Sequence, residues 1–200
     1  MAPIPLPTEV SCVFSKDSVD VTGPKGSIRV AWPNTLSGAV VNNALYILPK
    51  IDGVSAQWGT MRSRLNSLVR GVSTGWTRKF YIKGVGYNAQ KTPGGLIFSL
   101  GKSHQEFVAF EGHETQFPDC IPSNLCKKNA PVYMIDSFPK SISVDLNKEG
   151  TEITLGGIDT EVIGNVGHKL KKLRPRNPYK GDGIWSGHDI LRSKKGKQKK

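Results

Sequence analysis

The feature that most constrains how this chain folds is an internal repeat. Pro7–Asp20 aligns with Pro139–Glu152 at a constant offset of 132 residues, and the alignment extends over sixteen positions without a gap. The matched pairs include Pro7 with Pro139, Ser11 with Ser143, and Lys16 with Lys148. Two unrelated β-hairpins can resemble each other by chance, but shared polar residues within an ungapped register favour a duplicated unit.

Each copy of the repeat has the pattern of a β-hairpin. Alternating apolar residues flank a polar turn, which is Ser15–Ser18 in the first copy and Asn147–Gly150 in the second. This period of two, interrupted by turn-forming residues, is typical of two antiparallel strands. After the first copy, two further strand patterns follow at Ile28–Trp32 and Ala44–Ile51.

A helix pattern follows the strands of each half. In the first half, Thr60 can cap a helix and Gly71 can stop it, with an apolar face made of Met61, Leu65, Leu68 and Val69. In the second half, Asp159 or Thr160 can cap a helix that Pro175 ends, with an apolar face made of Val162, Val166, Leu170 and Leu173. The pattern of each half therefore predicts a sheet covered by one amphipathic helix.

These patterns predict an α+β fold of two similar small domains from internal duplication, each an antiparallel sheet packed with one α-helix, plus a basic C-terminal tail. The second domain opens with strand patterns at Lys79–Ile82, Val85–Tyr87 and Leu96–Leu100. The expected divisions are an N-terminal repeat domain at 1–78, a C-terminal repeat domain at 79–175 and the tail at 176–200. Residues 111–138 have no clear period and several prolines, which predicts a long surface insertion.

The end of the chain concentrates its positive charge. The net charge is +12, but residues 169–200 alone hold twelve Lys/Arg against two Asp, while the other 168 residues hold sixteen cations and fourteen anions. A near-neutral body with a cationic end is typical of a protein that binds a polyanion. A solvated tail that only aids solubility is the alternative. Tyr179, Ile184 and Trp185 lie among the charges, however, and a solvated tail has no use for large apolar groups. The rings of Tyr179 and Trp185 suit stacking on bases.

Other partners and activities find little support in the residues. The tail lacks the amphipathic helical stripe that membrane surfaces bind. The four histidines are scattered, and no hydrolase, metalloprotease or phosphate-loop motif occurs. The three cysteines, Cys12, Cys120 and Cys126, match neither a disulfide framework nor a zinc site. We therefore expect no enzyme, no cofactor, no metal, no membrane and no small-molecule substrate.

RNA is favoured over DNA as the polyanion. The sequence has no recognition-helix pattern and no dimerising heptad of the kind that docks in a DNA major groove. Basic, glycine-rich loops and a cationic tail suit the irregular surface of folded RNA, where shape and phosphate positions dominate recognition.

One stretch near the end of the chain points to a particular protein family. It is Pro178-Tyr179-Lys180-Gly181-Asp182-Gly183-Ile184. This stretch resembles the C-terminal motif of the large-subunit ribosomal protein six family, in its bacterial form. Other segments resemble the same family in order and spacing over nearly the whole chain outside the insertion; they are Val21–Gly26, Trp58–Arg62, Gly84–Tyr87, Leu100–His104 and Gly157–Asp159.

This resemblance implies a non-catalytic constituent of the large ribosomal subunit. Its expected partners are large-subunit rRNA beside the sarcin–ricin loop and stalk base, neighbouring large-subunit proteins, and translational GTPases that bind nearby. The residues predicted to contact rRNA combine the family motif with the basic positions of the tail: Ser103, His104, Lys169, Lys171, Lys172, Arg174, Arg176, Tyr179, Lys180, Gly181, Gly183, Trp185, Arg192, Lys194 and Lys195. Gly84, Gly86 and Tyr87 are expected to shape the domain instead.

Two departures from the family pattern refine this expectation. Asp182 stands where the family usually has Lys, and Asn88 stands where Arg usually follows the Gly-Tyr pair. The insertion and the Lys-rich ending after Arg192 also exceed the usual bacterial outline. We interpret them as signs of an organellar, mitochondrial ribosome, with a bacterial cytoplasm or a plastid as the alternatives. A free RNA-binding or ribosome-assembly module is the alternative function.

Overall fold

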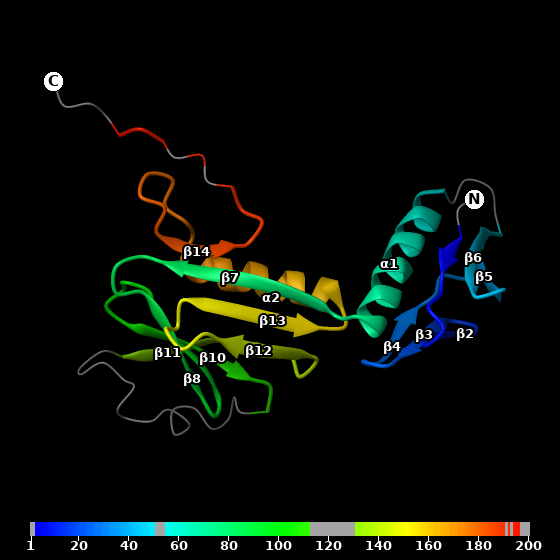
Figure 1. The fold of residues 1–200 in the computed structure, drawn as a ribbon, viewed down its shortest axis with the longest axis horizontal. Helices are drawn as coiled ribbons and strands as arrows, with labels where there is room; N and C mark the ends of the chain where they lie inside the picture. The colour runs from blue at the N-terminus through cyan, green and yellow to red at the C-terminus, as the bar shows by residue number, and fades with distance from the viewer. Residues whose placement is uncertain (1–2, 51–54, 113–130, 191, 193, 197–200) are drawn as a thin grey trace. The chain divides into compact units, whose positions relative to one another are not determined.

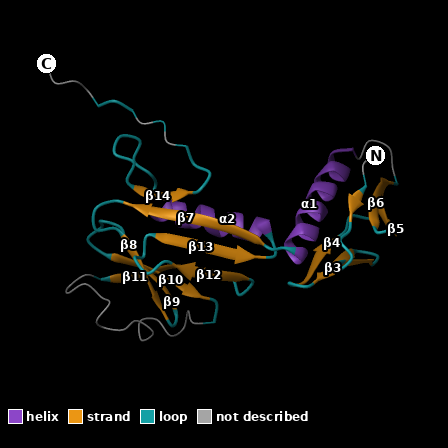
Figure 2. Ribbon diagram, in the orientation of Figure 1, coloured by secondary structure: helices purple, strands orange, loops and turns teal. Residues whose placement is uncertain are grey.

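The computed structural model describes residues 3–50, 55–112, 131–190, 192 and 194–196. The chain divides into two compact units. Unit 1 comprises Met1–Trp76 with Gly157–Thr160, and unit 2 comprises Thr77–Gly156 with Glu161–Lys200. Each unit combines one long helix with antiparallel strands (Figures 1 and 2), so the predicted α+β fold with two sheet-and-helix domains is confirmed. Neither described helix is long and apolar enough to cross a membrane.

Unit 1 contains two three-stranded antiparallel sheets and one helix. The first sheet has the order β1-β6-β5, with β1 at Ile4–Pro5, β6 at Ala44–Pro49 and β5 at Leu36–Val41. The second has the order β2-β3-β4, with β2 at Ser11–Phe14, β3 at Ser18–Gly23 and β4 at Gly26–Ala31. The core between these sheets and α1 (Ser55–Ser73) is built mainly from aliphatic side chains, with Val19, Leu36, Leu65 and Val72 fully buried.

Unit 2 contains two four-stranded sheets and helix α2 (Thr160–Leu173). One sheet has the order β12-β13-β7-β14, made by Ile142–Leu146, Glu152–Gly157, Trp76–Lys83 and Gly183–Ser186. The other has the order β11-β10-β9-β8, made by Val132–Phe138, Gln105–Phe110, Gly95–Ser99 and Asn88–Thr92. The pairing of β10 with β11 is parallel, which departs from the purely antiparallel sheet expected for this half.

The two copies of the repeat form hairpins of the same kind with different turns. In the first copy, Ser15 N–H donates to Ser18 O at 2.8 Å, whereas in the second Asn147 N–H donates to Glu152 O at 3.0 Å. The second turn is therefore two residues longer, although the sequences align without a gap. A shift of two residues keeps every side chain on its face of the sheet, since side chains alternate with period two. Val21 and its counterpart Ile153 are accordingly both fully buried.

Helix α1 begins and ends elsewhere than its sequence pattern predicts. It starts at Ser55, so Thr60 is an interior residue whose hydroxyl donates to Ala56 O at 3.0 Å. It continues through Gly71 to Ser73, and Gly75 follows with a φ of +82°. The predicted cap at Thr60 and stop at Gly71 were therefore wrong. The predicted apolar face was right, because Met61, Leu65, Leu68 and Val69 are all buried.

Gly71 is required for close packing, whereas Gly59 in the same helix is not. Replacing each glycine by Ala should therefore change stability in opposite directions. A methyl group on Gly71 would lie 1.9 Å from Ile158 O, whereas one on Gly59 would meet no atom within 4 Å. Helix propensity alone favours Ala over Gly by about 1 kcal/mol. We expect Gly59→Ala to raise the thermal unfolding midpoint and Gly71→Ala to lower stability by about 1–3 kcal/mol, as overpacking does. Equal effects of the two substitutions in calorimetry would contradict this packing role.

The end of the insertion is a strand. Residues 113–130 lie outside the described part of the chain, but Val132–Phe138 form β11, with Phe138 buried. The prediction of a surface insertion reaching residue 138 was therefore wrong for its last seven residues. Val85–Tyr87 is also a turn and not a strand, because it joins β7 to β8.

Helix α2 and the residues after it follow the sequence more closely. The helix begins at Thr160 and ends at Leu173, two residues before Pro175. Its buried stripe is Ile163, Val166, Gly167, Leu170 and Leu173, so the predicted face is displaced by one position at its start, where Val162 is only half-buried. The chain then returns to the sheet as β14, an edge strand paired antiparallel with β7. The segment expected to be a tail from residue 176 therefore begins as part of unit 2.

Candidate nucleic-acid interface

Three loops of unit 2 converge on the ring of Tyr87. They are Gly84–Tyr87 after β7, Leu100–His104 after β9, and Arg174–Asp182 after α2. Methyl groups on Gly84 and Gly101 would lie 2.5 Å and 2.4 Å from carbons of this ring, so both glycines are needed for its close packing. Arg174 Nη2 donates to Tyr87 Oη at 3.1 Å. We call these three loops the loop cluster.

Asn177 organises the last of these loops. Its Oδ1 accepts hydrogen bonds from the backbone N–H groups of Tyr179 at 2.8 Å and Lys180 at 3.5 Å. Its backbone N–H donates to Asp182 O at 2.7 Å, and its carbonyl accepts from Gly181 N at 2.9 Å. An Asn side chain that bonds the backbone two residues ahead stabilises a tight turn. The turn presents Tyr179, 59% exposed, and the exposed Lys180 at its tip.

Trp185 lies beneath this turn as its support. The indole N–H donates to Gly181 O at 2.7 Å, and the side chain is only 8% exposed. Lys83 Nζ lies 4.6 Å and Arg176 Cζ 5.7 Å from the ring centroid, within the range of cation–π attraction. Burial of the ring disfavours stacking of Trp185 on a base, and its predicted contact with rRNA stays a prediction. Its neighbours Lys83 and Arg176 present the charge.

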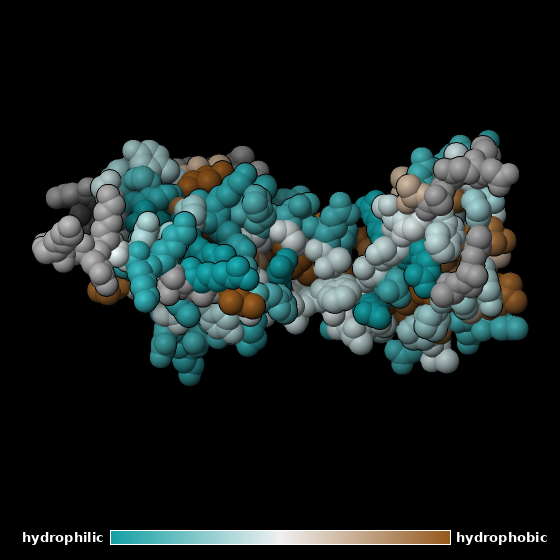
Figure 3. All heavy atoms as spheres, turned by 90° about the horizontal axis from the view of Figure 1, so that it is seen from above, coloured by the Kyte–Doolittle hydropathy of each residue, from teal (hydrophilic) through white to brown (hydrophobic). Residues whose placement is uncertain are grey.

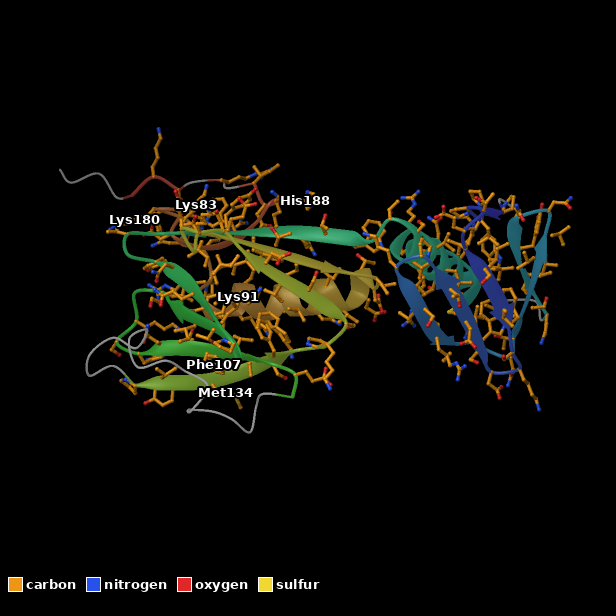
Figure 4. The ribbon with its side chains drawn as sticks, turned by 60° about the horizontal axis from the view of Figure 1, so that its bottom comes forward. Lys83, Lys91, Phe107, Met134, Lys180 and His188 are labelled. Atoms are coloured by element: carbon orange, nitrogen blue, oxygen red, sulfur yellow. The ribbon has the colours of Figure 1, made fainter. Side chains whose placement is uncertain are left out.

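Gly183 is also needed for the backbone conformation at the start of β14. It pairs with Lys83 in the β14–β7 ladder and has a φ of +126°. A methyl group there would lie 2.8–2.9 Å from backbone atoms of Arg174, Pro175 and Arg176. Gly181, with a φ of +79°, is buried in the same turn. These two glycines allow the turn to close, and Figure 4 shows Lys180 and Lys83 on the same end of unit 2.

The chain beyond β14 returns to the loop cluster. The backbone N–H of Lys194 donates to Pro178 O at 2.9 Å, which places that residue beside the turn at Tyr179. Arg192, Lys194 and Lys195 are all exposed. Lys197, Lys199 and Lys200 lie outside the described residues.

The Leu100–His104 loop is held by charge and ring contacts. Lys102 forms an ion pair with the buried carboxylate of Glu106, and His104 Nε2 lies 3.8 Å from the same oxygen. The imidazole also makes an edge-on contact with Tyr133 at 5.2 Å between ring centroids. Ser103 is exposed and His104 half-buried, so this loop offers a hydroxyl and one imidazole edge beside the cluster.

The predicted lysines of α2 are in part engaged by acidic partners. Lys169 Nζ lies 2.8 Å from Asp136 Oδ2 of β11, and Lys171 Nζ lies 2.8 Å from Asp189 Oδ2 after β14. Lys172 is exposed. Ion pairs at the surface contribute little stability, so these contacts hold the lysines only weakly. The residues predicted to contact rRNA therefore form two groups. One lies in the loop cluster and in the chain that returns to it after β14, and the other consists of the lysines on α2.

The Asp189 carboxylate predicts a change in acid stability. Burial acts to raise its pKa, but hydrogen bonds from Lys171 and the Ser186 N–H outweigh burial, and the pKa lies below the ordinary value of 3.8. A folded-state pKa below the unfolded one adds stability above the unfolded pKa, and this stability is lost as pH falls through the folded value. We therefore expect Asp189→Asn to be less stable than wild type at pH 6. The difference should shrink as pH falls below the ordinary pKa of 3.8, in acid-unfolding curves followed by circular dichroism. An offset independent of pH would contradict it.

Sequence reasoning missed three residues of this interface. Lys83 ends β7 above Trp185, Asn177 builds the turn, and Val85 is fully exposed between Gly84 and Gly86. The spacing of Gly84 and Gly86 could have indicated a turn there, since both have positive φ. Nothing in the sequence alone shows that Lys83 and Lys180 share one end of a unit. Among the described residues, no group of three or more His, Cys, Asp or Glu could hold a metal ion.

The arrangement suits a polyanion with exposed bases. A preorganised turn presents the exposed Tyr179 ring and Lys180. Lys83 and Arg176 lie against Trp185, which bonds this turn, and the backbone of Lys194 bonds Pro178. Cations neutralise phosphates, while an exposed ring stacks on a base or ribose. The fixed turn lowers the entropy lost on binding.

Comparison with known proteins gives consistent relatives over almost the full length. The large ribosomal subunit protein uL6 of Cereibacter sphaeroides is 32% identical over 199 residues, covering 98% of this chain and 96% of the relative. The uL6 protein of Thermosynechococcus vestitus is 33% identical over 198 residues, covering 98% and 94%. The plastid form, uL6c of Porphyra purpurea, is 30% identical over 194 residues, covering 96% and 92%. No protein-family model matches the sequence.

Proposed function

Because this chain belongs to the large ribosomal subunit protein uL6 family, we propose that it is a structural constituent of the large subunit that binds rRNA through the loop cluster of unit 2. The observation that carries the proposal is the preorganised turn at Asn177–Asp182. This turn presents Tyr179 and Lys180 beside Lys83, Arg176 and Lys194.

The charge distribution supports the choice of unit 2. Unit 2 holds 21 Lys/Arg against 11 Asp/Glu, whereas unit 1 holds seven against five. Phosphate neutralisation supplies most of the affinity of proteins for nucleic acids, so the cationic unit is the one expected to bind. In this proposal Ser103 and His104 approach the RNA from the neighbouring loop, and Arg174, Arg192 and Lys195 extend the cationic surface.

The resemblance to the family extends this proposal to a place on the subunit. The loop cluster binds rRNA near the sarcin–ricin loop and the stalk base, where translational GTPases dock. Neighbouring large-subunit proteins also contact the chain. The chain holds this RNA in place and takes no part in chemistry.

The function is tested by sedimentation and by salt titration of the full chain. We expect one copy per mature large subunit in quantitative mass spectrometry. RNA affinity should fall with salt at a log–log slope of about −3 to −5, since each phosphate contact contributes about −0.7 to −0.9. A chain found only in immature particles would identify an assembly module instead. A flat salt response would contradict the electrostatic interface.

We also propose that the ribosome in question is mitochondrial. The departures at Asp182 and Asn88 and the Lys-rich ending support an organellar member, while the relatives named above are bacterial and plastid proteins. Fractionation of cells that express the tagged chain tests this, because it should sediment with mitochondrial large subunits. Recovery in plastid ribosomes, or in those of a bacterial cytoplasm, would contradict it.

A further inference from the structure

An uncharged sheet face of unit 1 is exposed. In the β5–β6 pair, Ser37 lies opposite Leu48, Ala39 opposite Tyr46, and Val41 opposite Ala44. Because side chains alternate along a strand, these six residues share one face. Val41 is 51% exposed, Leu48 48% and Tyr46 38%. Figure 3 shows hydrophobic side chains at the surface on the side of unit 1 that carries β5 and β6. We call this surface the β5–β6 face.

The opposite side of the same strands belongs to the core of unit 1. Leu36, Leu45 and Ile47 are buried there against α1, together with Leu65 and Leu68 of the helix. The apolar residues of the β5–β6 face therefore contribute nothing to that core. A contiguous apolar surface beyond scattered single residues marks an interaction site.

Charge decides which kind of macromolecule fits this face. Neither Leu36–Val41 nor Ala44–Pro49 contains a Lys, Arg, His, Asp or Glu. The neighbouring sheet differs, since on its exposed side Asp20 accepts two hydrogen bonds from Arg29, at 2.6 Å and 2.9 Å. RNA needs cations to neutralise phosphate, and the β5–β6 face has none. An uncharged protein surface is complementary to it, because burial there leaves no charge unpaired.

We propose that the β5–β6 face docks an uncharged, apolar segment of another protein of the large ribosomal subunit. The proposal rests on the proposed place of this chain in that subunit. Unit 2 binds rRNA through its cations. Unit 1 meets a protein neighbour through the sheet β1-β6-β5, whose strands carry no ionisable side chain apart from Tyr46.

A photo-crosslinking residue at position 48 in the full chain tests the proposal in purified large subunits. We expect an adduct with one large-subunit protein, and we expect the additional change Val41→Lys to lower its yield about tenfold, because a buried unpaired charge opposes docking. The matched control is Val13→Lys, since Val13 is exposed on β2 of the same unit, opposite Asp20 on the charged face. This control should leave the yield unchanged.

Every other outcome overturns the proposal. An RNA adduct, an adduct between two copies of this chain, or no adduct would each do so, as would equal losses with Val13→Lys and Val41→Lys. Circular dichroism of both variants confirms that the strands still form. If the chain sediments with large subunits but position 48 forms no protein adduct, this inference fails and the proposed function stands. If the chain is absent from the subunits, both fail.

Discussion

Replacing Tyr179 and Lys180 together by Ala is expected to lower rRNA affinity about 10- to 100-fold without lowering thermal stability. Tyr179 is 59% exposed and Lys180 is exposed, so neither side chain contributes to the packing of unit 2. A stacked ring contributes about 1–3 kcal/mol per base, and a lost phosphate contact reduces the salt slope by about 1. Filter binding at several salt concentrations measures both effects.

Two single substitutions act as controls for this double variant. Tyr179→Phe keeps the ring and should bind nearly as wild type does. Lys140→Ala removes the same charge from an exposed site. The backbone N–H of Lys140 donates to the Glu111 carboxylate, which follows the end of β10 opposite to the Leu100–His104 loop. If Lys140→Ala weakened binding as much as the double change, the interface would depend on net charge and not on the loop cluster.

The second large effect is expected at Gly183. Gly183→Ala forces an L-residue to a φ of +126° and places its methyl 2.8–2.9 Å from three successive backbone segments. Strain of this kind combined with overpacking costs about 2–4 kcal/mol. Because β14 and the turn at Tyr179 would both be displaced, we expect a lower unfolding midpoint and weakened RNA binding in the same variant.

Gly86→Ala is the matched control for Gly183→Ala. Gly86 also has a positive φ, +71°, but a methyl there would meet no atom within 4 Å. The cost should be limited to the left-handed conformation, about 1 kcal/mol. If chemical denaturation gave the two variants equal losses, packing around Gly183 would not be the cause.

The repeat and the apolar faces of the helices could be predicted because they depend on local periodicity. The repeat aligns Val21 with Ile153, and both residues are fully buried even though the second turn is longer. Helix limits were predicted less well. Thr60 has the chemistry of a cap without being one, and Gly71 is explained by Ile158, which lies 87 residues away in the chain.

The candidate site was predictable in its residue types but not in its geometry. Tyr179 and Lys180 came from a motif, and the structure adds that Asn177 holds them in a turn. Trp185 was interpreted as a stacking ring because it lies among cations, yet pairing of β14 with β7 buries it. Lys83 belongs to the site through that same strand pairing, which joins residues a hundred positions apart. Contacts of this kind leave no signal in composition or spacing.

The pairing of β14 with β7 also has a consequence for synthesis of the protein. Chains emerge from the ribosome starting at the N-terminus, and domains fold as their last elements become available. Unit 1 includes Gly157–Thr160, and unit 2 is not closed until Gly183–Ser186 pair with β7. The hydrogen bond from Lys194 N–H to Pro178 O, beside the turn at Tyr179, forms only when Lys194 has left the exit tunnel. On a nascent chain, this surface is therefore complete only after β14 and Lys194 have left the exit tunnel.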